Sequence, residues 1–221
     1  MNKLLTAVLG FVCLTTSAQA QPVTAPVAAT QPPVAPNDPT IHRHLGFFLR
    51  PDLGVGFMTT TEPTRTSLGD LTISGPAGVL GFVVGGAVHE NIILGAHIFD
   101  GVVVNPTVTL SSGQSAGTSN TSLSMFGIGP EFTYYWMPSN LYFSGTLAVT
   151  RMSLTVNGSN NNSNVGFGAR LALGKEWWVS DHWGLGLAGH LSFSSNQDSG
   201  RGNTPTLSTW VFAAAFSATY N

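Results

Sequence analysis

The sequence predicts an all-β protein, an eight-stranded antiparallel transmembrane up-and-down β-barrel. Three observations lead to this prediction. Only 8% of the residues are charged and 43% are hydrophobic, whereas soluble domains average about 25% charged residues. Apolar residues recur with a period of two over long segments, as in strands with one apolar face. The connections between these segments alternate between short and long, which is typical of membrane barrels.

The period of two separates an apolar face from a small, glycine-rich face. In the segment from Met125, for example, Phe126, Ile128 and Phe132 share one face, and Gly127 and Gly129 lie on the other. A small face with few charges suits the crowded interior of a narrow barrel better than a water-exposed surface. Eight segments carry this pattern, at residues 44–58, 72–88, 92–105, 121–136, 141–155, 165–179, 183–195 and 207–220.

One segment also allows a membrane helix. Residues 71–88 are uncharged and long enough to cross a bilayer as a helix. Gly81 and Gly85 even form the G-x-x-x-G pattern of packed membrane helices. Pro76 and several glycines interrupt the run, and the other segments contain no run of that length. We therefore expect a strand, a tight turn at residues 89–91 and a second strand.

The connections predict which ends of the strands lie together. Short turns are expected at residues 89–91, 137–140 and 180–182, and longer loops at 59–71, 106–120, 156–164 and 196–206. With an even number of strands, the first and the last strand have their free ends on the same side of the membrane, which is also the side of the short turns. In bacterial outer membranes that side is the periplasm.

The residues before the barrel predict export from the cytosol. Residues 1–20 have the charge at Lys3, the apolar run and the Ala18-Gln19-Ala20 ending of a cleaved signal peptide. Residues 21–42 are rich in Pro, Ala and Thr and are expected to form an extended periplasmic tether, free to contact the cell wall or a periplasmic partner. The barrel domain then spans residues 43–221, and the single cysteine, Cys13, lies in the signal.

Aromatic residues cluster near the short turns and the C-terminus, where they are expected to form a girdle at the membrane interface. The proposed girdle consists of Trp136, Tyr142, Trp177, Trp178, Trp183 and Tyr220.

Charged residues on the glycine-rich face are expected to meet inside the barrel. Arg50, Asp52, Glu131 and Arg170 have this parity, and His97 and His190 share it. Unpaired charges in a narrow interior are costly, so these residues are expected to form salt bridges that plug the lumen. A gate for small ions remains the alternative role for the same residues.

These features resemble the small outer-membrane β-barrel proteins of Gram-negative bacteria, the eight-stranded class of the OmpA membrane domain and OmpX. The resemblance covers about residues 43–221 and includes the C-terminal strand WVFAAAFSATYN, with its aromatic Tyr220 followed by Asn221. It implies a monomer in the outer membrane, surrounded by lipid and assembled by the barrel assembly machinery through that strand. The class is functionally diverse, so the fold alone does not assign a function.

The leading prediction is a non-enzymatic barrel with a structural or surface-interaction role in the cell envelope. A porin-like narrow pore for small ions or solutes is the second possibility. A lipid-modifying hydrolase is the third, because His190 and Ser192 resemble the His-x-Ser pair of outer-membrane lipid A deacylases. We expect no cofactor, since the glycine pattern at residues 184–189 lies within one strand and lacks the helix of a dinucleotide site. We also expect no metal, because His42-Arg43-His44 at the barrel entrance has no evident third ligand, and no nucleic acid partner, given the net charge of −2.

Overall fold

The structure, a computed structural model, describes residues 43–63, 69–199 and 205–221, and these form strands, turns and loops without a helix. No helix within these ranges is therefore long and apolar enough to cross a membrane. The predicted signal peptide, residues 1–20, and the predicted tether, residues 21–42, lie outside the described residues.

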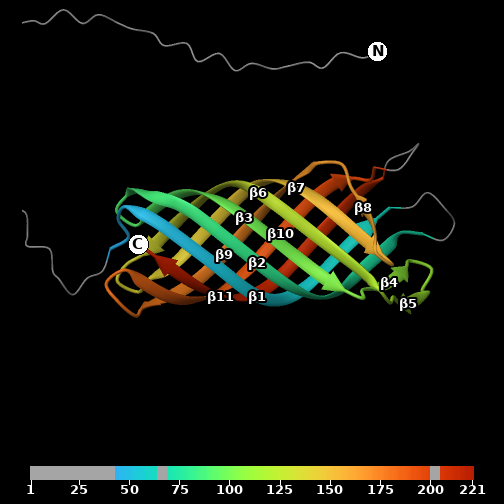
Figure 1. Cartoon of the computed structure of the whole chain (residues 1–221), viewed down its shortest axis with the longest axis horizontal. Coiled ribbons are helices and arrows are strands. Elements are labelled where there is room, and N and C mark those ends of the chain that lie inside the picture. The colour runs from blue at the N-terminus through green and yellow to red at the C-terminus, as the bar shows by residue number, and fades with distance from the viewer. Residues whose placement is uncertain (1–42, 64–68, 200–204) are drawn as a thin grey trace, which may run out of the picture. The chain divides into compact units, whose positions relative to one another are not determined.

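Eight long strands close into an antiparallel barrel (Figure 1). Each pairs with its neighbours in the ring, and β1 closes the ring by pairing with both β2 and β11. This confirms the predicted fold. The strands are β1 (Phe47–Glu62), β2 (Leu71–His89), β3 (Ile92–Val104), β6 (Thr121–Trp136), β7 (Leu141–Val156), β9 (Gly166–Trp178), β10 (Trp183–Gln197) and β11 (Thr206–Tyr220).

The two ends of the barrel differ as the connection lengths predicted. One end, the turn end, carries the short β2–β3, β6–β7 and β9–β10 connections, the start of β1 and the C-terminus. Two of these turns place Asn91 and Asn140 at positive φ, 63° and 52°, which asparagine adopts more readily than most residues. The other end, the loop end, carries the longer connections.

Two of the predicted loops contain additional strands at the loop end. Residues 106–120 include a hairpin of β4 (Thr107–Leu110) and β5 (Ser115–Gly117), and β4 pairs with the part of β2 that extends past β3. Residues 156–164 include β8 (Ser159–Asn162), which folds back on β7. The hairpins satisfy backbone groups that would otherwise remain unpaired at the rim.

The first strand also differs from its prediction. The predicted range was 44–58, whereas β1 starts at Phe47 and continues to Glu62. Its polar extension pairs with β11, where the hydroxyls of Thr60 and Thr209 are 2.8 Å apart inside the barrel. The extension was assigned to a loop because its threonines do not continue the apolar alternation.

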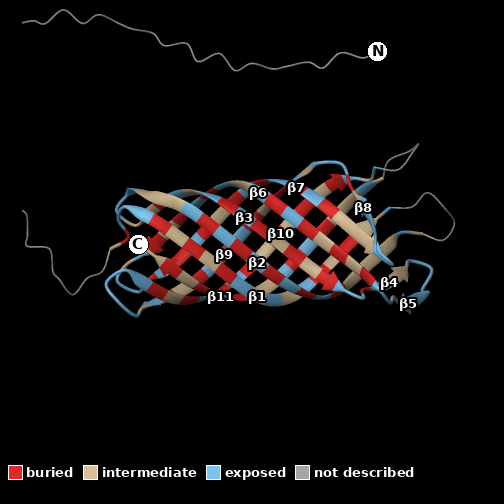
Figure 2. Ribbon diagram, in the orientation of Figure 1, coloured by how far each residue is buried: buried red, intermediate tan, exposed pale blue. Residues whose placement is uncertain are grey.

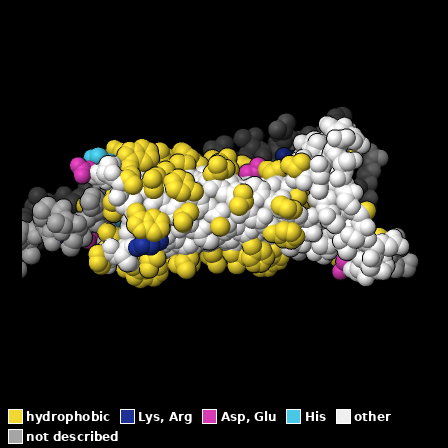
Figure 3. Space-filling model, turned by 90° about the horizontal axis from the view of Figure 1, so that it is seen from below, with side chains coloured by type: hydrophobic (Ala, Val, Ile, Leu, Met, Phe, Trp, Pro, Cys, Tyr) yellow, Lys and Arg dark blue, Asp and Glu magenta, His cyan; other side chains and the backbone are white. Residues whose placement is uncertain are grey.

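More buried and less buried residues alternate along most of each long strand (Figure 2). The exposed positions are largely apolar, and Leu53 and Leu147 keep 66% and 73% of their surface accessible. On the face shown in Figure 3, hydrophobic side chains are spread along the barrel from the turn end and are largely absent near the loop end. An exposed apolar area of this extent is typical of a surface that contacts lipid.

Four of the six proposed girdle residues face outward near the turn end. Trp136, Trp177 and Trp183 are exposed on the outer wall, and Tyr220 packs against Trp183 with ring centroids 5.3 Å apart. Lys175, beside them, donates a hydrogen bond of 2.6 Å to the carbonyl of Ser139 and lies over the ring of Trp177.

The other two proposed girdle residues were assigned wrongly. Tyr142 is only 1% exposed and belongs to the interior. Trp178 is half-buried, and its ring lies 5.0 Å from the buried ring of His44. Both have inward parity, opposite to that of Phe143 and Trp177. Their closeness to the turns had suggested an interfacial position, but strand alternation directs each side chain to the interior.

The lipid contact of the outer wall can be tested with a pair of arginine substitutions on β7. Leu147→Arg places a charge within the apolar surface, and we expect it to lower the free energy of unfolding in lipid vesicles by about 2–4 kcal/mol. Thr155→Arg lies on the same face of the same strand but beyond Arg151, among polar residues, and should cost at most about 1 kcal/mol. Urea titration followed by tryptophan fluorescence measures both, and equal effects would contradict a lipid boundary between them.

Candidate functional site

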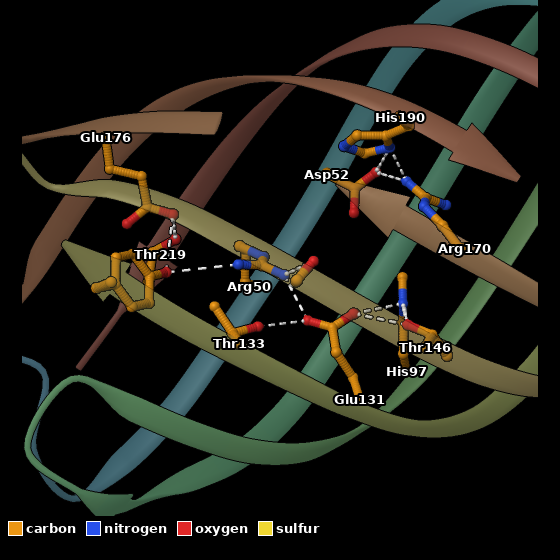
Figure 4. A network of polar contacts seen from close by, with 12 residues as sticks. Arg50, Asp52, His97, Glu131, Thr133, Thr146, Arg170, Glu176, His190 and Thr219 are labelled. Carbon is orange, nitrogen blue, oxygen red and sulfur yellow. Dashed lines mark hydrogen bonds and ion pairs between the residues drawn. The ribbon is translucent and has the colours of Figure 1, made fainter. Parts of the chain in front are cut away.

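The described strands bring the predicted interior residues into one polar layer that crosses the barrel (Figure 4). We name this layer the interior charge network. All of its predicted members are buried, with at most 8% of their surface exposed. These members are Arg50, Asp52, His97, Glu131, Arg170 and His190.

One branch of the network centres on Glu131. Its Oε1 accepts a hydrogen bond of 2.5 Å from Arg50 Nη2 and one of 2.9 Å from the hydroxyl of Thr133. Its Oε2 lies 2.7 Å from His97 Nδ1 and accepts a hydrogen bond of 3.0 Å from Thr146. Both carboxylate oxygens therefore have several partners, as a buried charge requires.

Aromatic side chains complete the surroundings of Arg50. Its guanidinium lies 4.5 Å from the ring centroid of Tyr142 and 5.5 Å from that of Phe48. It also donates a 3.5 Å hydrogen bond to the hydroxyl of Tyr135. The aromatic faces attract the cation in a region without bulk water, so Arg50 is held by cation–π contacts as well as by Glu131.

The second branch connects β1 to the opposite wall. Arg170 Nη2 on β9 donates a 2.7 Å hydrogen bond to Asp52 Oδ1. His190 Nδ1 lies 3.7 Å from the same oxygen and also contacts Arg170 Nη2. The predicted pairing of two arginines with two acids is therefore present in the geometry, as two separate ion pairs that both start from β1.

The structure adds a third acid that the sequence analysis omitted. Glu176 on β9 is 1% exposed, and its Oε1 accepts hydrogen bonds from Tyr135, at 3.1 Å, and from Thr219, at 2.7 Å. Its parity matches that of Arg170 on the same strand, so the alternation rule could have placed it inside. With Glu176, the part of the chain that the structure describes has three buried acids and two buried arginines.

Glycines on neighbouring strands make room for these side chains. A Cβ on Gly81 would lie 2.2 Å from Asp52 Oδ2, and a Cβ on Gly174 would lie 2.5 Å from the ring of Tyr142. The glycines on the small face of the strands thus leave the space that the large interior side chains occupy. Any larger residue at either glycine must displace a member of the network or its aromatic support.

Apolar layers lie on both sides of the interior charge network. Toward the loop end, Phe99, Met125, Met152 and other residues form a buried group that we name the loop-end cluster. Toward the turn end, Phe48, Ile93 and others form a second buried group that includes Tyr135 and Tyr142. A cavity of about 10 Å³ between the network and the loop-end cluster has room for about one water molecule.

His44, which was expected at the barrel entrance as a solvent-exposed residue, is instead buried and closes the turn end. The ring is buried and stacks on Tyr135 with centroids 3.5 Å apart. Its Nε2 donates a 2.8 Å hydrogen bond to Asn140 Oδ1, and its Nδ1 contacts Asn221 Nδ2. Burial, assisted by the positive charge of Arg50 and opposed by the two asparagine hydrogen bonds, lowers the pKa of His44 from 6.5 to about 4.

The geometry does not favour the alternative chemistries. His190 and Ser192 are both buried inside the barrel, away from the lipid surface that a lipid-modifying hydrolase must face. Within the described residues, no group of three or more His, Cys, Asp or Glu side chains is arranged to hold a metal ion. His42 lies outside the described residues, and His44 is occupied by asparagine contacts.

Searches with the sequence find no matching family model and no matching curated protein. Solved structures do match. The chain is similar in fold to small outer-membrane β-barrel proteins. Neisserial surface protein A is 13% identical, with a TM-score of 0.47 over 79% of this chain and 96% of that one. The outer membrane protein AlkL is 12% identical, with a TM-score of 0.48 over 84% and 94%. OprG from Pseudomonas aeruginosa is 14% identical, with a TM-score of 0.44 over 82% and 98%.

The stabilising role of the interior charge network can be tested by comparing two glutamates. We expect Glu131→Ala to lower the free energy of unfolding by about 3–5 kcal/mol, because Arg50 is left buried without its carboxylate. Glu90→Ala removes the exposed ion pair with Arg43, at 3.1 Å, and should cost at most about 1 kcal/mol. Urea unfolding of both variants in the same vesicles gives the comparison, and similar small losses would exclude a stabilising network.

The closure by His44 predicts a dependence on pH. Below pH 6.5 the unfolded chain binds a proton at His44, whereas the folded chain does so only near its lowered pKa of about 4. Stability should therefore fall as the pH drops from about 6.5 toward 4, with a loss at pH 5 of about 2 kcal/mol from this residue. The measurement is the difference in unfolding free energy between the native chain and His44→Gln at pH 7 and at pH 5. A difference that is the same at both values would contradict a neutral, buried His44.

Proposed function

We propose that the protein is a non-conducting outer-membrane barrel with a structural or surface-interaction role in the cell envelope. The observation that carries this proposal is the interior charge network, in which Arg50 and Arg170 are each paired with an acid across the barrel at 2.5 and 2.7 Å. Paired charges of this kind fill space and hold opposite walls together. They leave no row of free charges for a permeating ion to follow.

The order of the interior layers supports a plug over a pore. An ion that enters from the loop end meets Phe99, Met125 and Met152 before it reaches the interior charge network. An ion that enters from the turn end meets His44 stacked on Tyr135. Barrels of eight strands have interiors that side chains fill, so apolar layers on both sides of the charges are an effective barrier to ions.

The outer wall supports the location. Its apolar surface suits the hydrocarbon of a membrane, and the difference between the two ends gives a direction. In this proposal the turn end faces the periplasm, together with the predicted tether at residues 21–42, and the loop end faces the outside. The chain acts as a monomer, contacts lipid all round, and is assembled through its C-terminal strand, β11, which closes the ring against β1.

Single-channel recording of the chain in a planar bilayer at high salt tests the plug. We expect no conductance steps from the native chain, and none from Glu131→Ala, because the loop-end cluster remains in place. Insertion is checked independently by protection from added protease.

Reproducible steps from the inserted native chain would contradict the plug. Steps that also change with Glu131→Ala would make a pore the primary function and the network its gate. A lipid-modifying activity is tested separately, by mass spectrometry of lipid extracted after incubation with the native chain and with His190→Ala.

A further inference from the structure

The mouth of the barrel at the loop end contains a cavity that the interior charge network does not include. Its volume is about 360 Å³, within the range of small-molecule sites. It is lined by inward-facing residues from β1, β2, β6, β7, β8 and β11 and by the start of the β10–β11 connection. The loop-end cluster separates it from the charged layer below.

The floor of this cavity is apolar. Leu123 and Met152 belong to the buried loop-end cluster, and Ile73, Leu154 and Leu207 pack against that cluster while they line the cavity. Other buried members of the loop-end cluster, such as Phe99 and Met125, do not line this cavity. The floor side chains line an open volume, so an apolar group placed on this floor would gain the free energy of removing both surfaces from water.

The polar part of the cavity lining consists of two acids and several neutral polar side chains. Glu62 and Asp198 are half-buried, and they lie near enough to influence each other electrostatically. No ion pair joins either carboxylate to a cation among the described residues, and no described arginine or lysine lines the cavity. Asn161, Asn162 and Ser199 add neutral polar groups around them.

We propose that this cavity binds a small amphipathic cation, with its apolar part on the floor of leucines and its positive group between Glu62 and Asp198. Two neighbouring carboxylates that have no counter-ion among the described residues favour a positive ligand, and their half-burial strengthens that attraction. The apolar floor favours an organic cation over a metal ion, which would require more oxygen ligands. The inference deepens the proposed surface-interaction role and rests on it for the side of the membrane that the cavity faces.

The test uses three probes that share a hexyl chain and carry a cationic, a neutral or an anionic head group: hexyltrimethylammonium, 1-hexanol and hexanesulfonate. The full chain is inserted in nanodiscs of zwitterionic phosphatidylcholine, which have no net charge to concentrate the cation. Methionine methyl groups labelled with ¹³C report binding, because Met152 lines the cavity whereas Met137 lies in a turn at the opposite end. We expect hexyltrimethylammonium to shift the Met152 signal with saturation, 1-hexanol to bind more weakly, and hexanesulfonate to leave the signal unchanged.

Matched variants separate the local acids from the total charge. Glu62→Gln with Asp198→Asn should weaken binding of the cation by about tenfold or more and leave binding of 1-hexanol nearly unchanged. Glu90→Gln with Asp181→Asn removes the same charge from exposed turns at the turn end and should have no effect. Leu154→Trp fills the floor and should abolish binding of both probes.

Three results would overturn the proposal: no Met152 shift with any probe, equal binding of the cation and 1-hexanol, or equal effects of the two double variants. Binding does not depend on conductance, so a failed binding test and a failed plug test can be told apart.

Discussion

The interior depends on two opposite charges that lie two residues apart on β1. Arg50 reaches Glu131 on β6, and Asp52 is reached by Arg170 on β9. In the ring of strands, β2 and β3 separate β1 from β6, and β11 and β10 separate it from β9. Because β6 and β9 are the two neighbours of β7, both ion pairs connect β1 to the far side of the barrel. A one-residue slip of β1 would turn both charges toward lipid, so these ion pairs specify the register of the barrel as well as filling it.

The same constraint explains the composition of the strands. A closed ring of eight strands has a fixed, narrow interior. Large groups such as the Tyr142 ring and the Asp52 carboxylate fit only where the opposing position has no side chain, at Gly174 and Gly81. Because these glycines lie in paired strands, their role is to leave space rather than to provide flexibility. Substituting one of them and substituting the side chain it accommodates should disturb the same part of the network.

Strand alternation predicted from the sequence which side chains face the barrel interior. The errors concern residues to which the same rule was not applied. Alternation placed Arg50, Glu131 and Arg170 in the interior. The same rule also places Glu176 and Tyr142 there. Tyr142 was instead assigned to the girdle because it lies near a turn. The pairing of Asp52 with Arg170 could not be predicted, since it depends on the stagger of strands distant in sequence. His44 lies in the predicted strand of residues 44–58 and on the same face as Arg50, but alternation alone does not show that its ring stacks on Tyr135 and closes the turn end.

The order of the apolar and charged layers along the barrel determines what the loop end can do. Charged side chains alone can admit water, whereas the apolar groups around Phe99 and Met152 exclude it, so the two kinds of layer together are a stronger barrier than either one. The cavity at the loop end therefore has a closed floor, formed by the same Met152 that seals the layer below. A molecule that enters there can be retained but has no route through the plug. In a barrel closed by this plug, ligands are recognised in the cavity at the loop end. The buried charges then contribute by stabilising the strands that form this cavity.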